Sequence, residues 1–186
     1  MAWTFFSLQM AFESRPDDTW RRHVRNAIVS GQANQDAEDK RRFYQELVPL
    51  LVGRLPQLRR VAWDLQRTAS TQADFDEWVT DLEDSSDVEP PDPTAAEQEA
   101  RHVVVTLLVL AAGGGNADQA LGEACDFPED RWLKRQSLAR ILSVVPMLSF
   151  SSVRSDAVYL QPGRGLPGMT AEELEEGWVD MALVED

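Results

Sequence analysis

Alternating and continuous apolar segments predict the strands of this chain. Apolar side chains recur at every second position of 3–12, which is the period of a strand with one strongly apolar face. The segment 101–112 is apolar from Val103 onwards except for Thr106, and it is rich in β-branched residues. It is shorter than the about 20 residues that cross a bilayer. We therefore predict a strand at about 102–111 that is buried on both faces and central in its sheet.

Two further segments have the pattern of a strand, but each also fits a second structure. Residues 58–65 satisfy the period of a strand and also that of a helix, so both structures stay open. Residues 147–160 are predicted as one long strand with a bulge or as a hairpin that turns at 154–156. With the two strands above, these segments predict a small mixed sheet of three to five strands.

Apolar positions spaced three or four apart predict two helices after the first strand. One begins at Asp17 or Asp18, either of which can cap it, and ends at Gly31. The next begins near Asp36, and we expect a kink or break at Pro49 because proline lacks the backbone donor. The residues that these helices are expected to bury are Trp20, Val24, Ala27, Ile28, Phe43, Leu47, Leu50 and Leu51, flanked by Tyr44 and Val48.

The sequence after residue 70 predicts four more helices. One begins at Thr71, a short one covers 117–124, and a longer one begins at Pro128 and ends at Pro146. Thr170 and Glu173 form a capping box for the last helix. The expected inward residues are Phe75, Trp78, Val79 and Leu82, then Trp132, Leu138, Ile141, Leu142 and Val145, and finally Leu174 and Trp178.

These elements predict one α+β domain over residues 1–186. Helices occur before and between a few strands without regular βαβ alternation, and the amphipathic helices are expected to cover the sheet. An acidic, proline-containing connector at about 84–96 is the one internal boundary that the composition suggests.

Composition and charge bear on the partners and on the location of this protein. The 186 residues carry a formal net charge of −14, which makes nucleic acid an unfavourable partner because phosphates would be repelled. The N-terminal residues do not resemble a secretory signal, and no segment is long enough to cross a membrane, so we expect a soluble cytoplasmic protein without an integral membrane segment. The single cysteine, Cys125, excludes an internal disulfide and fits a reducing compartment.

The charge is distributed unevenly, which suggests a surface that orients a protein partner or a second copy of the chain. Residues 15–67 contain 11 Lys or Arg and 7 Asp or Glu, residues 68–100 contain 11 acids and no base, and residues 166–186 add seven acids without a base. The interface candidates are Arg21, Arg22 and Arg25, which face outward on the first helix, and Trp3 and Trp178, which lie near the chain ends.

The sequence contains no set of residues that indicates a reaction. The glycines Gly113, Gly114 and Gly115 follow a strand and precede a helix, which makes them weak cofactor-binding candidates, but they match no nucleotide-binding spacing. The two histidines have no partner at metal-ligand spacing. The acids beside Cys125 are expected to raise the pKa of its thiol. We therefore predict no catalytic residues, no metal and no cofactor.

Three blocks of this sequence resemble the domain-of-unknown-function family 1517 of cyanobacterial and chloroplast proteins. They are FSLQMAFE, FYQELVPLLVGRLPQLRRVAWD, and VVVTLLVLAA with AVYLQPGRGLPGMTAEELEEGW. Pro49 and the triple-glycine turn depart from the family pattern. The resemblance implies no activity or catalytic residues, and we expect this protein to lack the membrane segment that family members usually carry before this domain. The matching residues of the last block are Val158, Tyr159, Leu160, Pro162, Met169, Thr170, Glu173, Leu174 and Trp178.

Three functional hypotheses remain from the sequence. The first is a non-catalytic protein–protein interaction module that acts as an accessory subunit or adaptor. The second is a small-ligand-binding or enzymatic domain that uses a cleft near Gly113–Gly115. The third is an acidic, immunity-type inhibitor of a basic partner, whose binding would weaken steeply with salt.

Overall fold

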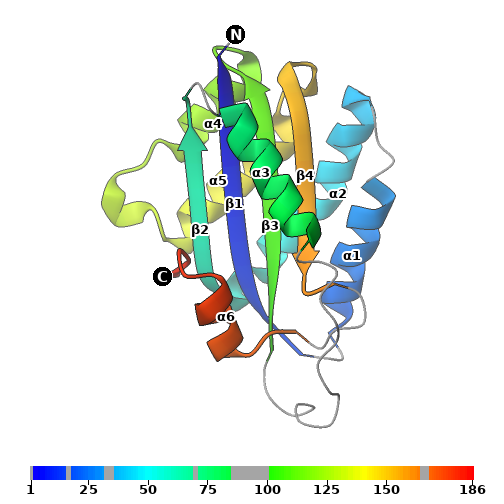
Figure 1. Cartoon of the computed structure of the whole chain (residues 1–186), viewed down its shortest axis with the longest axis vertical. Coiled ribbons are helices and arrows are strands. Elements are labelled where there is room, and N and C mark those ends of the chain that lie inside the picture. The colour runs from blue at the N-terminus through cyan, green and yellow to red at the C-terminus, as the bar shows by residue number, and fades with distance from the viewer. Residues whose placement is uncertain (1, 16–17, 32–35, 69–70, 85–100, 164–167) are drawn as a thin grey trace.

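The computed structural model describes residues 2–15, 18–31, 36–68, 71–84, 101–163 and 168–186. Within them the chain forms a five-stranded sheet in the order β4-β3-β1-β2-β5, with helices on both faces (Figure 1). The strands are β1 (Trp3–Ser14), β2 (Leu58–Gln66), β3 (Arg101–Ala112), β4 (Val153–Gln161) and β5 (Ala182–Leu183), and the helices are α1 (Thr19–Gly31), α2 (Ala37–Arg54), α3 (Thr71–Asp84), α4 (Asn116–Cys125), α5 (Arg135–Val144) and α6 (Ala171–Gly177).

This arrangement confirms the α+β class. Every neighbouring pair among the named strands is antiparallel, where a mixed sheet was expected. β3 is an interior strand with almost every residue buried, as predicted, although β1 holds the middle position. The ambiguous segment 58–65 is a strand, β2, which pairs antiparallel with β1.

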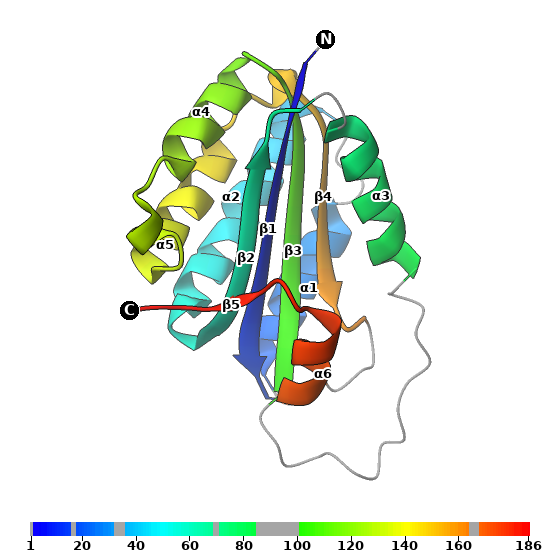
Figure 2. The same ribbon diagram turned by 60° about the vertical axis from the view of Figure 1, so that its left-hand side comes forward.

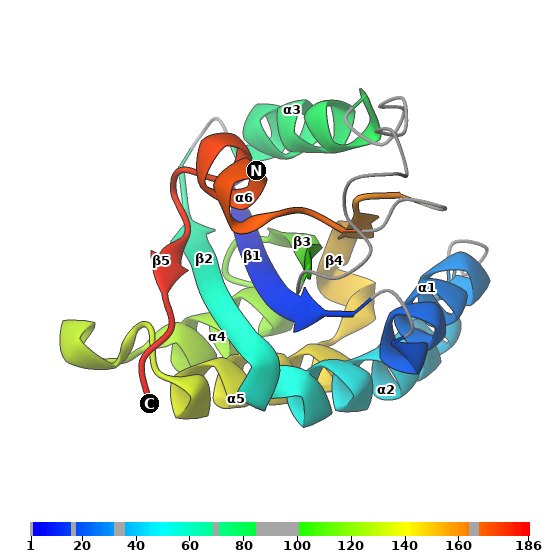
Figure 3. The same ribbon diagram turned by 90° about the horizontal axis from the view of Figure 1, so that it is seen from below.

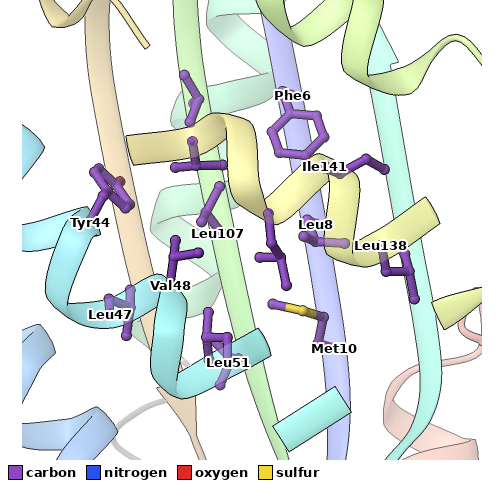
Figure 4. Close-up of a cluster of buried hydrophobic side chains, with 14 of the residues drawn as sticks. Phe6, Leu8, Met10, Tyr44, Leu47, Val48, Leu51, Leu107, Leu138 and Ile141 are labelled. Carbon is purple, nitrogen blue, oxygen red and sulfur yellow. The ribbon is translucent and has the colours of Figure 1, made fainter. Parts of the chain in front are cut away.

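One face of the sheet carries the main hydrophobic core. The alternating residues Phe6, Leu8 and Met10 of β1 and Leu107 of β3 are fully buried there. Leu47 and Leu51 of α2 and Leu138 and Ile141 of α5 point into the same layer, as Figure 4 shows. Viewed from below, α1, α2, α4 and α5 form one layer under the sheet (Figure 3). The two-residue period of β1 thus determines which face these helices cover.

The other face is covered by α3 and α6 (Figure 2). Phe75 of α3 packs against Phe5 of β1, Leu82 of α3 belongs to the same cluster, and Leu174 of α6 belongs to a separate small cluster. Between these clusters the strands present polar side chains that are nevertheless buried, Ser7, Gln9 and Thr106. This face therefore has less apolar area than the opposite one.

Two helix predictions differ from the structure in part. Of the kink or break expected at Pro49, the break is absent: α2 continues through Pro49, which lies on the exposed side, where water can satisfy the carbonyl that loses its partner. The helix predicted from Pro128 to Pro146 starts later than expected, since α5 begins only at Arg135. Glu185 of the C-terminal segment donates to the Leu133 carbonyl and accepts from the Arg135 N–H, which keeps this backbone extended.

The prediction for residues 147–160 was also wrong in its first half. β4 begins at Val153, and residues 154–156 continue the strand without a hairpin. Before it, the Ser152 N–H and hydroxyl both donate to the Ser149 carbonyl at 2.8 Å, which closes a tight 3-10 turn. The acidic connector predicted at 84–96 lies outside the described residues after Asp84.

Candidate protein-binding groove at the edge of the sheet

The outer edge of β2 is only half covered. β5 pairs with Arg60 and Val61, and Val184 donates its N–H to the Arg59 carbonyl. Among the strands that the structure describes, none pairs with residues 62–66 on this side, whereas on the other side they all pair with β1. Figure 3 shows β5 beside β2 at this edge of the sheet.

The direction of the β2 backbone follows from the contact with the C-terminal segment. The Arg59 carbonyl points outward, since it accepts from Val184. Peptide groups alternate in direction along a strand, so the N–H groups of Val61, Trp63 and Leu65 also point outward. The last two lie beyond the reach of β5, and they form a short row of backbone groups along which an extended chain can pair.

An open groove of ≈ 620 Å³, here called the edge groove, lies beside this part of β2. Its walls come from β2, from α4 and from the segment between α4 and α5. Trp63 and Trp132 form its apolar end, with ring centroids 5.8 Å apart and planes at 66°. The described residues that line it are Trp63, Asp64, Leu65, Arg67, Gln119, Gly122, Glu123, Cys125, Asp126 and Trp132.

Hydrogen bonds hold the two tryptophans in place. The indole N–H of Trp63 donates to the Trp132 carbonyl at 3.0 Å, and the indole N–H of Trp132 donates to the Phe127 carbonyl at 3.0 Å. Trp132 is 45% exposed, although the sequence predicted an inward position. A large, fixed and exposed aromatic ring beside an open strand edge is typical of a protein-binding anchor.

The net charge of the edge groove is negative. Asp64, Glu123 and Asp126 contribute three carboxylates. Among the described lining residues the one cation is Arg67, which donates from Nε to Asp118 Oδ1 at 2.7 Å, so its charge is largely balanced within the protein. Arg140 reaches from α5 and donates to the backbone carbonyl of Glu123. A basic segment is therefore better suited to this groove than an acidic one.

Cys125 is one of the residues that line the edge groove, and it is buried. Burial raises the pKa of its thiol to about 12, against a smaller opposite influence of Arg67 and Arg140. The thiol is therefore protonated at neutral pH, and the thiolate required of a nucleophile is scarce.

The triple-glycine turn is held by an aspartate. Gly114, at a positive φ of 76°, donates its N–H to Asp118 Oδ2 at 2.7 Å. Burial favours a higher pKa for this carboxyl group, but the hydrogen bonds from Gly114, Arg67 and Thr4 outweigh burial and lower the pKa. A negative charge thus already sits at the start of α4, where a phosphate would have to bind. A side chain at Gly113 would also press on the Ala2 carbonyl.

The three arginines of α1 have different environments. Arg21 is buried and donates to the Pro162 and Gly163 carbonyls at 3.1 and 3.4 Å, and burial lowers its pKa to about 10. Arg25 also reaches the Gly163 carbonyl, and Arg22 is exposed. In the described structure, Arg21 and Arg25 therefore connect α1 to the segment that follows β4.

Arg21→Met is expected to lower the free energy of unfolding by about 1–2 kcal/mol, because methionine keeps much of the packing but leaves two carbonyls without this donor. Arg22→Met, on the exposed side of the same helix, should change it by less than about 0.5 kcal/mol. Urea unfolding of both variants measures the difference. Equal effects would show that the Arg21 contacts contribute nothing specific.

The two terminal tryptophans both pack on the face that α3 and α6 cover. Trp3 and Trp178 are partly buried against the cluster around Phe5, and Trp178 also contacts the cluster around Leu174. The structure therefore places them on one face, away from Trp63 and Trp132 of the edge groove. Neither of these last two was among the interface candidates from the sequence.

Within the described residues, no group of three or more His, Cys, Asp or Glu side chains could hold a metal ion. No described helix is both long enough and apolar enough to cross a membrane. Comparison with known proteins found no matching family model, no matching curated protein and no matching solved structure. The edge groove is thus interpreted from its own geometry.

Proposed function

We propose that this chain is a non-catalytic protein–protein interaction module that binds an extended segment of a basic partner in the edge groove, where the segment adds a strand beside residues 62–66. The observation that carries the proposal is the half-covered edge of β2 next to a groove with a fixed tryptophan pair. Main-chain hydrogen bonds would provide affinity, and the groove would select the side chains.

The C-terminal segment supports this mode of binding. β5 already pairs antiparallel with the first half of the β2 edge, through Arg60 and Val61. A partner strand would continue the sheet along the second half. The edge is therefore compatible with strand addition, because the chain itself uses it in this way.

Charge favours a basic partner over a second copy of the chain. A second copy would bring the same three groove carboxylates, Asp64, Glu123 and Asp126, to the contact, and each copy carries a net charge of −14. Like charges across a contact suppress pairing. A segment with Lys or Arg would instead be attracted, and its binding would weaken with salt.

The remaining hypotheses have less support. Asp118 at the glycine turn occupies the place that a phosphate would need, so the structure adds no support for a ligand site at Gly113–Gly115.

We keep membership of family 1517 as a proposal, supported by the capping box of Thr170 and Glu173 at the start of α6. A cytoplasmic location is proposed on the single free cysteine.

A display library of short random peptides, selected against the full chain, tests the proposed function. The expected ligands alternate apolar and other residues and are enriched in Lys and Arg. In ¹⁵N NMR spectra they should shift resonances of residues 62–66 and of α4. Ligands that shift only residues near Gly113–Gly115, or no enrichment over an unrelated control domain, would contradict the proposal.

A further inference from the structure

The side chain of Asp64 makes an unusual hydrogen bond with an outward-pointing backbone N–H of β2. Its Oδ1 accepts the Leu65 N–H at 2.7 Å, and its Oδ2 accepts the Gln66 side-chain amide at 2.8 Å. The Leu65 N–H is one of the two outward donors on which strand addition depends. In the free protein this donor is therefore already occupied by a carboxylate.

We propose that Asp64 is the specificity-determining residue of the edge groove and that it selects a segment with Lys or Arg directly opposite it. This inference rests on the proposed function. A strand that pairs with Leu65 must bring its own carbonyl to the N–H and displace the carboxylate. A neutral segment would leave the displaced carboxylate close to that carbonyl oxygen. A cation opposite Asp64 draws the carboxylate away and compensates its charge.

The position of Asp64 in β2 also defines which partner residues must flank the basic residue. Asp64 pairs with Ser7 of β1 and so lies on the sheet face that α3 and α6 cover, whereas Trp63 and Leu65 lie on the groove face. Residues directly opposite in an antiparallel pair share a face. The partner must then place its basic residue between two apolar residues, which contact Trp63 and Leu65. The predicted ligand contains an apolar, Lys or Arg, apolar triplet.

The neighbouring arginines, Arg60 and Arg67, do not balance the charge of Asp64. Arg60, on the same sheet face as Asp64, forms an ion pair with Glu175, and Arg67 forms one with Asp118. The side chain of Asp64 is exposed, and among the described residues it accepts hydrogen bonds from a backbone amide and a side-chain amide, which are neutral donors. Its charge is thus available to a cation that arrives with a partner.

The hydrogen bond between Asp64 and the Leu65 N–H also limits pairing of the β2 edge with unmatched strands. An open strand edge promotes aggregation, and a charge placed on it is a common protection. Asp64 would act in this way by occupying the Leu65 N–H until a matching cation displaces it. Asp64→Ala should therefore bind more kinds of segment, since the N–H becomes free for any carbonyl.

Two selected peptides that differ only by Lys→Gln at the position opposite Asp64 test the inference. NMR contacts identify that position, and fluorescence anisotropy gives the affinities. With the wild-type chain the Gln peptide should bind about fivefold more weakly. With Asp64→Ala the two peptides should bind within about twofold of each other, and the Gln peptide should bind more tightly than it does to wild type.

Asp126→Ala is the matched control, because it removes a groove carboxylate that does not touch the Leu65 N–H. It should leave the ratio between the Lys and Gln peptides unchanged. Equal binding of both peptides to wild type, or the same ratio in Asp64→Ala, would overturn the role of Asp64. If peptides shift residues 62–66 but show no dependence on Asp64, only this inference fails. If no peptide shifts these residues, the proposed function fails with it.

Discussion

Asp118→Ala is expected to lower the free energy of unfolding by about 2–4 kcal/mol at neutral pH. The carboxylate accepts the Thr4 hydroxyl at 2.8 Å, Arg67 Nε at 2.7 Å and the Gly114 N–H at 2.7 Å, and its side chain is only 9% exposed. Alanine would leave the buried Thr4 hydroxyl and the Gly114 N–H without this acceptor. Urea unfolding measures the change.

Asp126→Ala is the control, since Asp126 is an exposed acid just after the same helix as Asp118, and its effect on the free energy of unfolding should stay below about 0.5 kcal/mol.

Asp118→Asn tests the role of the Asp118 charge through the dependence of stability on pH. The folded pKa of Asp118 is lowered, so its contribution is fully present above the unfolded pKa of about 3.9 and is lost as pH falls through the folded pKa. The stability advantage of wild type over Asp118→Asn should shrink below about pH 4. An advantage that is independent of pH down to strongly acidic conditions would contradict this role.

Trp132→Ala is expected to weaken binding of the selected peptides by about 30-fold, or about 2 kcal/mol. The ring forms the apolar end of the edge groove together with Trp63, and it is held in place by its own indole hydrogen bond. Because the ring is 45% exposed, the free energy of unfolding should fall by only about 1 kcal/mol. Isothermal titration calorimetry gives the affinity, and urea unfolding gives the stability.

Met147→Ala is the control for the loss of an exposed apolar side chain. Met147 is 79% exposed and lies outside the groove lining, so its removal should leave peptide affinity unchanged. A similar loss of affinity in both variants would show that general surface hydrophobicity, and not the tryptophan pair, binds the peptide.

Much of the fold could be predicted because it depends on local period. The alternation in β1 and the apolar run of β3 identify two interior strands, and the Thr170–Glu173 capping box identifies the start of α6. Residues 58–65 remained ambiguous because their apolar positions satisfy two periods. Only the pairing with β1 and β5 decides that this segment is a strand.

The edge groove could not be predicted, because its parts are distant in the sequence. Trp63 and Trp132 are 69 positions apart and meet only after the segment before α5 folds back. The C-terminal contact that keeps Lys134 extended before α5 has no signal in the sequence, and β5 is only two residues long. The hydrogen bond between Thr4 and Asp118 spans 114 positions, so the structural role of the glycine turn was equally hidden.

Amide hydrogen exchange at Trp63 tests the central claim most directly. Its N–H points to the open side of β2, whereas the N–H of Ala62 points to β1, opposite Gln9. In the free chain the Trp63 amide should exchange at least about a hundredfold faster than the Ala62 amide, and a selected peptide should protect Trp63 while leaving Ala62 unchanged. If a peptide binds and Trp63 exchange does not slow, the partner strand does not add to this edge and the account is contradicted.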